Sequence, residues 1–315
     1  MTSPSDLNSL GLLALFAELE RTGLPRRLLE LARDEDLGAG AAQGDLTTES
    51  WFTDQRHAEA KLAAREPGVA SGIAALPLIL DVFGCTAVVK VRVADGARFS
   101  RGEVLATISG SLPNLLRIER TMLNLVSRLS GIATLTSEYV GAIGAGTRAA
   151  LYDTRKTTPG LRVLEKYAVR CGGGRSHRLG LHDAVLIKDN HLAGVPKAQQ
   201  VERLVDASRR AREARPGCFV QIEVDSLEQL ERFLATPAGT IDAVLLDNMT
   251  PDELKRAVAV RDRIRPGVQL EASGGITLET IRAVALSGMD RISVGAITHG
   301  ARAIDLGLDI EATAP

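Results

Sequence analysis

A run of basic side chains between residues 153 and 191 holds the groups best suited to binding a charged small molecule. The run contains eight Lys or Arg residues against four acids, although the whole chain has a formal net charge of −1. The cations are Arg155, Lys156, Arg162, Lys166, Arg170, Arg175, Arg178 and Lys188. Cations gathered in a walled cleft focus the field, so the run predicts a pocket for a strongly anionic molecule. A solvated basic surface is the alternative, but Pro159 and the glycines at 172–174 are not typical of a solvated helix face.

Apolar runs recur through the second half of the chain, separated by stretches with helical spacing. They lie at 148–153, 184–188, 218–224, 242–247, 268–273 and 291–296. Alternating strands and helices predict a parallel sheet with right-handed crossovers. Capping boxes predict helices that begin after Ser226 and Thr250, and we expect Thr277 to cap the next one. A closed or nearly closed (β/α) barrel fits six such strands, with a doubly wound open sheet as the alternative.

Polar groups end each of these runs, and in a (β/α) barrel the carboxyl ends of the strands surround the active site. The groups expected there are Asp153, Arg155, Lys156, Lys188, Glu223, Asp247, Glu271, Ser273 and Gly295. Neighbouring residues such as Asp189, Asp225 and Asn248 could be no more than helix caps or turn formers. Carboxylates at Glu223 and Asp247 can bind sugar hydroxyls or help to hold magnesium together with substrate phosphates. An internal salt bridge is the competing interpretation for both acids.

Two glycine-containing segments near the end of the array predict a phosphate site. Ser273-Gly274-Gly275 precedes Ser293-Val294-Gly295 by about 20 residues. Barrels commonly bind phosphate with the loops after the last two strands, where glycine lets backbone N–H groups approach an oxyanion. A tight turn would explain either segment alone, but the ordered pair favours the phosphate site.

Four cations are expected to face that phosphate site across the barrel mouth, namely Arg155, Lys156, Arg178 and Lys188. The guanidinium fork of arginine suits a planar carboxylate because it donates two parallel hydrogen bonds. His177 adjoins Arg178, although a lone histidine is more often structural than catalytic. The histidines of this run do not have the spacing of zinc ligands.

The first 117 residues differ from the rest, because short strands alternate with turns and residues 91–110 have the rhythm of a hairpin. A helix predicted over 119–143 connects this region to the barrel. We therefore divide the chain into an N-terminal α/β domain at 1–117 and a barrel domain at 118–315. The C-terminal tail can pack back on the first domain.

The composition excludes several classes of protein. A nearly neutral chain gives no general case for nucleic acid or membrane binding, and no apolar run approaches the roughly 18 residues of a membrane span. The first residues lack the basic and apolar regions of a signal peptide. The three cysteines are too scattered for a disulfide framework, which favours reduced thiols. We expect a cytoplasmic protein.

The segments that carry these residues resemble, in chain order, those of the quinolinate phosphoribosyltransferase family. They are GDLTTE, AAREPGVASGI, ERTMLNLVSRLSGIATLT, DTRKTTPGLRVLEKYAVRCGGG, SHRLGL, LIKDNH, IEVDSL, LLDNM, EASGGI and SVGAITH, and they cover roughly residues 28–310. The resemblance implies an N-terminal α/β sandwich domain followed by an incomplete (β/α) barrel. It also implies a homodimer or larger homo-oligomer with a shared active site. The implied reaction uses magnesium and converts quinolinate and phosphoribosyl pyrophosphate to nicotinate mononucleotide, pyrophosphate and carbon dioxide, in de novo NAD synthesis.

The resemblance further implies a role for each matching residue. Arg120 would reach into the site of a neighbouring subunit. The quinolinate carboxylates would be bound by Arg155, His177 and Arg178. The remaining contacts would be Lys156 and Lys188 to substrate and sugar, Glu223 and Asp247 to ribose hydroxyls and magnesium, and Ser273, Gly274, Gly275 and Gly295 to the 5′-phosphate. Three positions depart from the family pattern, Ser176 in place of Asn, Asp225 in place of Glu and Gly300 in place of Ser, and none removes a charged ligand.

Three alternatives stay open. A paralogous, molybdenum-transport-associated phosphoribosyltransferase would act on another substrate, but LIKDNH and DTRKTTPGLR favour the quinolinate enzyme. A Schiff-base aldolase barrel would use Lys188 as its nucleophile beside the same phosphate site. A non-catalytic sensor of anionic nucleotides would not need six polar strand ends.

Overall fold

The computed structural model describes residues 4–38, 44–53 and 56–312, and its chain forms two compact units. The first unit comprises the residues up to Ser9, Glu138–Lys156 and Gly174–Ala296, and the second comprises Leu10–Ser137, Thr157–Gly173 and the residues from Ile297 onward. Helix α6 (Leu112–Ile143) passes from the second unit into the first. The domain boundary predicted after residue 117 lies within this helix.

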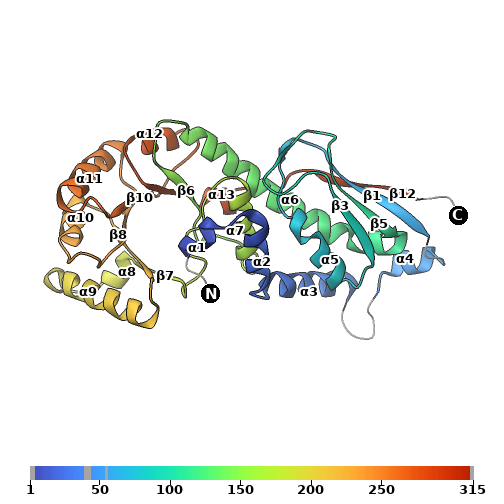
Figure 1. Ribbon diagram of the computed structural model, residues 1–315, viewed down its shortest axis with the longest axis horizontal. Helices are drawn as coiled ribbons and strands as arrows, with labels where there is room; N and C mark the ends of the chain where they lie inside the picture. Colours follow the sequence, from blue (N-terminus) through green and yellow to red (C-terminus); the bar gives the residue numbers. More distant parts are fainter. Residues whose placement is uncertain (1–3, 39–43, 54–55, 313–315) are drawn as a thin grey trace. The chain divides into compact units, whose positions relative to one another are not determined.

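A six-stranded parallel sheet forms the first unit, with the strand order β6-β11-β10-β9-β8-β7 (Figure 1). Its strands are β6 (Ala150–Tyr152), β7 (Ala184–Ile187), β8 (Phe219–Val224), β9 (Ala243–Asp247), β10 (Gln269–Ser273) and β11 (Arg291–Ser293). All six lie within the apolar runs, which confirms the expected array. Strands β6 and β7 are the two edges of the sheet, so the barrel is incomplete.

Helices follow the strands of this unit and lie outside the sheet (Figure 1). They are α8 (Asp189–Leu192), α9 (Lys197–Ala214), α10 (Leu227–Leu234), α11 (Pro251–Ile264) and α12 (Ile281–Leu286), with α1 (Pro4–Ser9) joining from the start of the chain. The side chain of Ser226 caps α10, and Thr250 begins α11 with a reciprocal capping box. The cap predicted at Thr277 is wrong. Its N–H donates to Thr280 Oγ1 at 2.9 Å, residues 278–280 form a turn, and α12 begins after Thr280.

Side chains alternate along the strands between an apolar and a polar face. Val220, Ile222, Val244, Leu246, Leu270 and Ile292 are buried on one face. The residues between them include Gln221, Glu223, Asp247, Glu271, Ser273, Arg291 and Ser293. Parallel sheets usually carry apolar side chains on both faces. The inner face of this barrel carries many polar side chains beside apolar ones such as Leu245, so it is the face on which a candidate site is sought.

The second unit is an α/β sandwich built on an antiparallel sheet with the order β12-β1-β5-β3. Its strands are β1 (His57–Ala64), β3 (Ala87–Val91), β5 (Val104–Ser111) and β12 (Leu306–Ala312), with a small ladder of β2 (Gly68–Val69) and β4 (Arg98–Phe99). The C-terminal strand β12 pairs with β1, so that Leu62 lies opposite Leu308. The helical elements of this unit are α2 (Leu12–Glu20), α3 (Leu24–Leu37), α4 (Leu46–Trp51), η2 (Ile73–Ala75), α5 (Leu76–Val82), α7 (Arg162–Cys171) and most of α13 (Ala296–His299).

Candidate functional site

Four strands of the barrel end at the same level. Asp247 pairs with Ser273, Ser273 with Ser293, and Ser293 with Tyr152 across neighbouring parallel strands. Residues directly opposite each other in a sheet point to the same face. Asp247 and Ser273, two of the polar strand ends predicted from the sequence, therefore lie with Ser293 along one edge, on the inner face of the barrel.

Two arginines, Arg155 and Arg178, lie near enough to influence each other's charge. Arg178 is 8% exposed, and its Nη1 donates to the carbonyl of Ala184 at 3.2 Å. Burial and then the nearby charge of Arg155 lower the pKa of Arg178, while Asp183 opposes them. The Nε of Arg178 is buried and has no hydrogen-bond acceptor among the described residues. A buried cation beside a like charge is unfavourable, and a bound anion would offset both charges. Arg155 and Arg178 are therefore a candidate anion site.

The segment that carries Arg178 runs along the open edge of β6. Arg175 donates to the carbonyl of Leu151 at 2.8 Å and accepts from the N–H of Asp153 at 3.1 Å. The Asp153 carboxylate then accepts the N–H of His177 at 2.8 Å. These bonds add a short strand-like segment to β6, and they fix the backbone that leads to Arg178.

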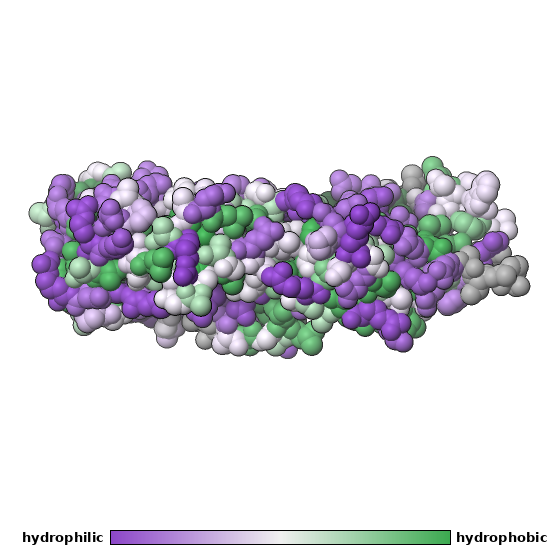
Figure 2. Space-filling view, turned by 90° about the horizontal axis from the view of Figure 1, so that it is seen from above, coloured by the Kyte–Doolittle hydropathy of each residue, from purple (hydrophilic) through white to green (hydrophobic). Residues whose placement is uncertain are grey.

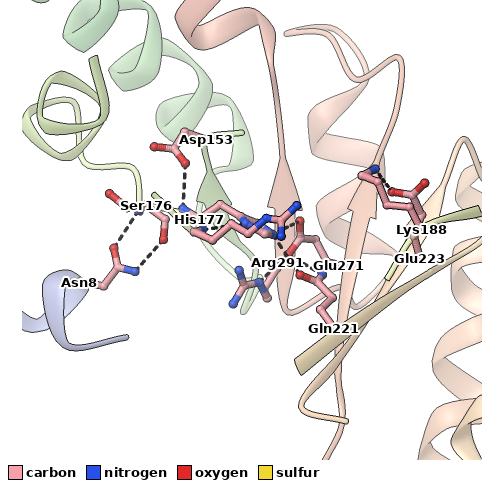
Figure 3. A network of polar contacts seen from close by, with 10 residues as sticks. Asn8, Asp153, Ser176, His177, Lys188, Gln221, Glu223, Glu271 and Arg291 are labelled. Carbon is pink, nitrogen blue, oxygen red and sulfur yellow. Dashed lines mark hydrogen bonds and ion pairs between the residues drawn. The ribbon is translucent and has the colours of Figure 1, made fainter. Parts of the chain in front are cut away.

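A buried polar network lies beneath this segment, as Figure 3 shows. His177 Nδ1 accepts the N–H of Arg178 at 2.8 Å, and His177 Nε2 lies 3.0 Å from Gln221 Oε1. Gln221 donates to Glu271 at 3.1 Å, and Arg291 donates to the same carboxylate at 2.6 Å. In this arrangement His177 orients the backbone of Arg178. Its predicted contact with quinolinate stays a prediction.

Glu271 is the fully buried anion of that network. Burial acts to raise the pKa of Glu271, but the neighbouring His177 and Arg291 outweigh it and hold the pKa below its usual value. The guanidinium of Arg291 also lies over the ring of Tyr152, 3.8 Å from its centre. Both hydrogen bonds reach Glu271 Oε2, whereas Oε1 accepts none from the described residues and lies 3.5 Å from His177 Nε2. Connected polar contacts of this kind fix the inner face of the barrel more rigidly than isolated ones would.

Lys188 and Glu223 form an ion pair at the ends of β7 and β8, which Figure 3 shows beside the network. The Lys188 side chain is 41% exposed and that of Glu223 is 13% exposed. Both the salt bridge and the strand-end position expected from the sequence are therefore present. An exposed ammonium held beside a carboxylate can turn to meet an anionic ligand with little rearrangement.

Asp247 and Gly274 are connected through Asn248. The Asn248 amide donates to Asp247 at 2.9 Å, and its backbone N–H donates to the carbonyl of Ser273 at 2.9 Å. Asn248 has a φ of 55°, a conformation that asparagine tolerates better than most residues. Gly274 has a φ of 95°, and a Cβ there would lie 2.2 Å from Asn248 Oδ1. Glycine is therefore required at this position, and the loop holds its backbone close to Asp247.

The acids Glu223 and Asp247 could hold part of the coordination shell of a magnesium ion. Glu223 and Asp247 lie on neighbouring strands, with Glu223 opposite Leu245 and hence on the same face as Asp247. Among the described residues, no three His, Cys, Asp or Glu side chains gather as a complete metal cluster. Magnesium typically takes one or two protein carboxylates and completes its shell with water and phosphate oxygens. Two carboxylates without a full cage fit that behaviour.

Most of the predicted site residues lie in the first unit, and Arg120 lies in the second. Arg120 is exposed on α6. The sequence interpretation overlooked Gln221 and Arg291, although Gln221 precedes Glu223 by two residues and so shares its face of β8. It also overlooked Asn8, whose side chain bonds to the backbone of Ser176. Within the described part of the chain, no helix has the length and apolar character needed to cross a bilayer.

The fold is an incomplete (β/α) barrel with polar and cationic side chains on its inner face, a class of protein suited to anionic small molecules. Family models named quinolinate phosphoribosyl transferase, N-terminal domain and C-terminal domain, match residues 45–130 and 132–309. The chain therefore belongs to the quinolinate phosphoribosyltransferase family.

Individual proteins show the same relationship. The chain is 46% identical over 287 residues to the nicotinate-nucleotide pyrophosphorylase [carboxylating] of Mycobacterium leprae, covering 90% of this chain and 96% of the relative. It is 38% identical to the probable nicotinate-nucleotide pyrophosphorylase [carboxylating] of Bacillus subtilis, covering 88% and 90%. The solved nicotinate-nucleotide pyrophosphorylase of Francisella tularensis superposes with a TM-score of 0.79 at 32% identity, covering 97% of this chain and 99% of that structure.

Proposed function

We propose that this protein is a quinolinate phosphoribosyltransferase of the decarboxylating type. It joins quinolinate to phosphoribosyl pyrophosphate and yields nicotinate mononucleotide, pyrophosphate and carbon dioxide, a step of de novo NAD synthesis. The observation that carries the proposal is the buried Arg178 beside the half-buried Arg155, whose mutual repulsion a dicarboxylate would relieve. Membership of the family, shared with relatives that carry this name, supports the same activity.

The two arginines and His177 would hold the pyridine ring by its carboxylates. Bidentate guanidinium–carboxylate contacts fix a planar anion in one orientation, which aims the ring nitrogen at the anomeric carbon of the sugar. The nitrogen attacks as the bond to pyrophosphate breaks, so the carbon–nitrogen bond replaces a carbon–oxygen bond. When the adjacent carboxylate leaves as carbon dioxide, its bonding electron pair stays on the ring carbon as a carbanion, which the positively charged ring nitrogen stabilises. A proton then adds to that carbon.

The phosphorylated substrate would lie along the polar strand ends. Ser273, Gly274, Gly275 and Gly295 would donate to the 5′-phosphate, because glycine allows close approach of backbone N–H groups. Lys156 and Lys188 would stabilise charge that builds up on the departing pyrophosphate. Glu223 and Asp247 would hold the ribose hydroxyls and the magnesium ion, which when bound offsets the negative charge of the pyrophosphate.

Lys188 also distinguishes this reaction from Schiff-base chemistry. A lysine nucleophile is normally desolvated and neutral. Lys188 instead forms an ion pair and has a 41% exposed side chain. This arrangement favours anion binding over covalent catalysis and argues against an aldolase.

A homodimer, or a larger homo-oligomer, would complete the site by supplying Arg120 from a second copy. Arg120 is exposed on α6 and so is accessible to another chain. Large apolar side chains exposed on the second unit, among them Trp51 at 79% and Leu46 at 81%, are candidates for the surface that assembly would cover. Cytoplasmic localisation is part of the proposal.

The test offers quinolinate and nicotinate in parallel, each with phosphoribosyl pyrophosphate and magnesium, and measures nicotinate mononucleotide. Carbon dioxide is followed from quinolinate labelled in its 2-carboxylate. We expect product and labelled carbon dioxide in equal amounts from quinolinate, and no product from nicotinate. Product from nicotinate alone, or from neither base, would overturn the proposal, the second result pointing to the paralogue with another substrate.

A further inference from the structure

Asn8, on the short helix α1, makes a pair of hydrogen bonds to the segment that carries the anion site (Figure 3). Its side-chain nitrogen donates to the carbonyl of Ser176 at 2.9 Å, and its side-chain oxygen accepts the N–H of Ser176 at 2.8 Å. Both partners lie in the first unit, although 168 residues separate them in the sequence. Leu7, the preceding residue, is 5% exposed and anchors α1 to the protein.

The direction of these bonds follows from the extended backbone around Ser176. In a strand, successive residues turn their N–H and C=O groups to opposite sides. Arg175 turns both groups toward β6, where Leu151 and Asp153 bind them. Ser176 therefore turns its own groups away from the sheet, and the carboxamide of Asn8 meets them as the backbone of a neighbouring strand would.

Ser176 is 4% exposed, so its backbone groups depend on Asn8 for partners. A buried N–H or C=O that loses its partner is costly, and the backbone moves or admits water to avoid that cost. The next two residues are His177 and Arg178. A shift at Ser176 would thus displace the guanidinium that the proposed mechanism uses to bind a carboxylate, while the strand ends of β8 to β11 would stay in place.

We propose that Asn8 is a positioning residue for quinolinate binding, and that it acts by holding Ser176 and hence Arg178 in register. The inference rests on the proposed function. Asn8 lies before residue 45, where the match to the N-terminal family model begins, so the family models do not describe this contact. The N-terminal helix is then a working part of the active site.

The experiment compares full-length wild type with Asn8→Ala and Asn8→Asp. The aspartate variant keeps an acceptor for the Ser176 N–H but sets a carboxylate oxygen against the Ser176 carbonyl. Gln199→Ala is the matched control, because it removes an exposed carboxamide from α9 of the same unit. We expect Asn8→Ala to raise the KM for quinolinate about ten-fold, the effect of losing one or two neutral hydrogen bonds. The aspartate variant should be at least as impaired.

Positioning of the quinolinate site predicts a specific pattern of effects. In Asn8→Ala, kcat and the KM for phosphoribosyl pyrophosphate should stay within about two-fold of wild type, as should all constants of Gln199→Ala. The inference would be overturned if both Asn8 variants left the quinolinate KM unchanged, or if the KM values for quinolinate and for phosphoribosyl pyrophosphate rose equally. Wild-type turnover of quinolinate would still support the proposed function in that case.

Amide hydrogen exchange provides a readout that does not need turnover. The peptide over residues 174–179 should exchange at least several-fold faster in Asn8→Ala than in wild type, because the Ser176 N–H loses its acceptor. Unchanged exchange in this peptide would refute the inference that Asn8 holds the Ser176 backbone. If the wild type failed to use quinolinate, both the proposed function and the role of Asn8 in quinolinate binding would be refuted. The exchange rate would still decide whether Asn8 holds Ser176.

Discussion

Replacing Arg178 by glutamine should separate ligand affinity from the stability of the protein without ligand. Burial and the charge of Arg155 lower the pKa of Arg178, so the charged guanidinium is disfavoured in the folded protein relative to the unfolded chain. A base with a lowered pKa destabilises the fold as long as it stays charged, and a neutral side chain removes that cost. Glutamine also keeps an amide that can donate to the carbonyl of Ala184. The free energy of unfolding without ligand should therefore stay within about 1 kcal/mol of wild type, or rise.

Affinity for quinolinate should fall steeply in the same variant. Each hydrogen bond between charged partners contributes about 1.5–3 kcal/mol, so the loss of a bidentate pair removes about 3–4 kcal/mol after partial compensation. That free energy corresponds to a Kd for quinolinate that is about 100- to 1000-fold weaker. The KM for phosphoribosyl pyrophosphate should change much less, because its proposed contacts lie on other strands.

Isothermal titration with quinolinate, together with urea denaturation in the absence of ligand, measures both quantities. Arg175→Gln is the control, since it removes the same charge from an exposed residue of the same segment. A quinolinate Kd within three-fold of wild type would remove Arg178 from the anion site. A loss of stability of several kcal/mol without ligand would instead show that its charge is compensated in the folded protein, and the argument from repulsion would fail.

Further predictions concern the phosphate loop, the buried network and the thiols. Gly274→Ala should raise the KM for phosphoribosyl pyrophosphate at least ten-fold in steady-state kinetics, because its Cβ would lie 2.2 Å from the Asn248 amide oxygen. Gly275→Ala should raise this KM less, because its Cβ meets no described atom within 4 Å. Equal effects of the two substitutions would contradict this reasoning. Glu271→Gln should lower the free energy of unfolding at pH 7 by about 3–5 kcal/mol in urea titrations, since Arg291 stays buried without its carboxylate. The pKa of Glu271 is held below its usual value, so the wild type loses this stabilisation as the pH falls through the folded pKa. The difference in unfolding free energy between wild type and Glu271→Gln should therefore narrow below about pH 4.3. A difference that stays constant with pH would refute this prediction. Burial raises the pKa of Cys171 to about 12. Iodoacetamide at pH 8 should therefore leave this thiol unmodified in the native protein and alkylate it in urea. Labelling of native Cys171 in mass spectrometry would contradict this prediction.

The strands of the barrel could be predicted because each leaves a local signal in the sequence. Apolar β-branched runs that end in polar residues located all six strands, and the same pattern placed Glu223 and Asp247 at the strand ends. The capping box at Thr250 was predicted correctly, because both of its partners lie within one turn. The cap at Thr277 was not, because an intervening turn uses the same residue types as a helix start.

Contacts between distant segments account for what the sequence did not predict. Asn8 and Ser176 are 168 residues apart, and no periodicity connects them. Gln221 and Arg291 were overlooked for a different reason, since a polar residue inside a strand suggests solvent exposure until the barrel turns that face inward. Period-2 alternation along β8 carried a signal for Gln221, because it shares a face with Glu223.

The row formed by Asp247, Ser273, Ser293 and Tyr152 gives the candidate site a length that the backbone fixes. Neighbouring strands lie about 4.8 Å apart, so the row extends about 14 Å along the curved sheet. Backbone hydrogen bonds set these intervals, and a change of side chain leaves them unaltered. Point substitutions can therefore change which chemical group is recognised at each strand end. A substrate of a different length would require a different spacing of the strands.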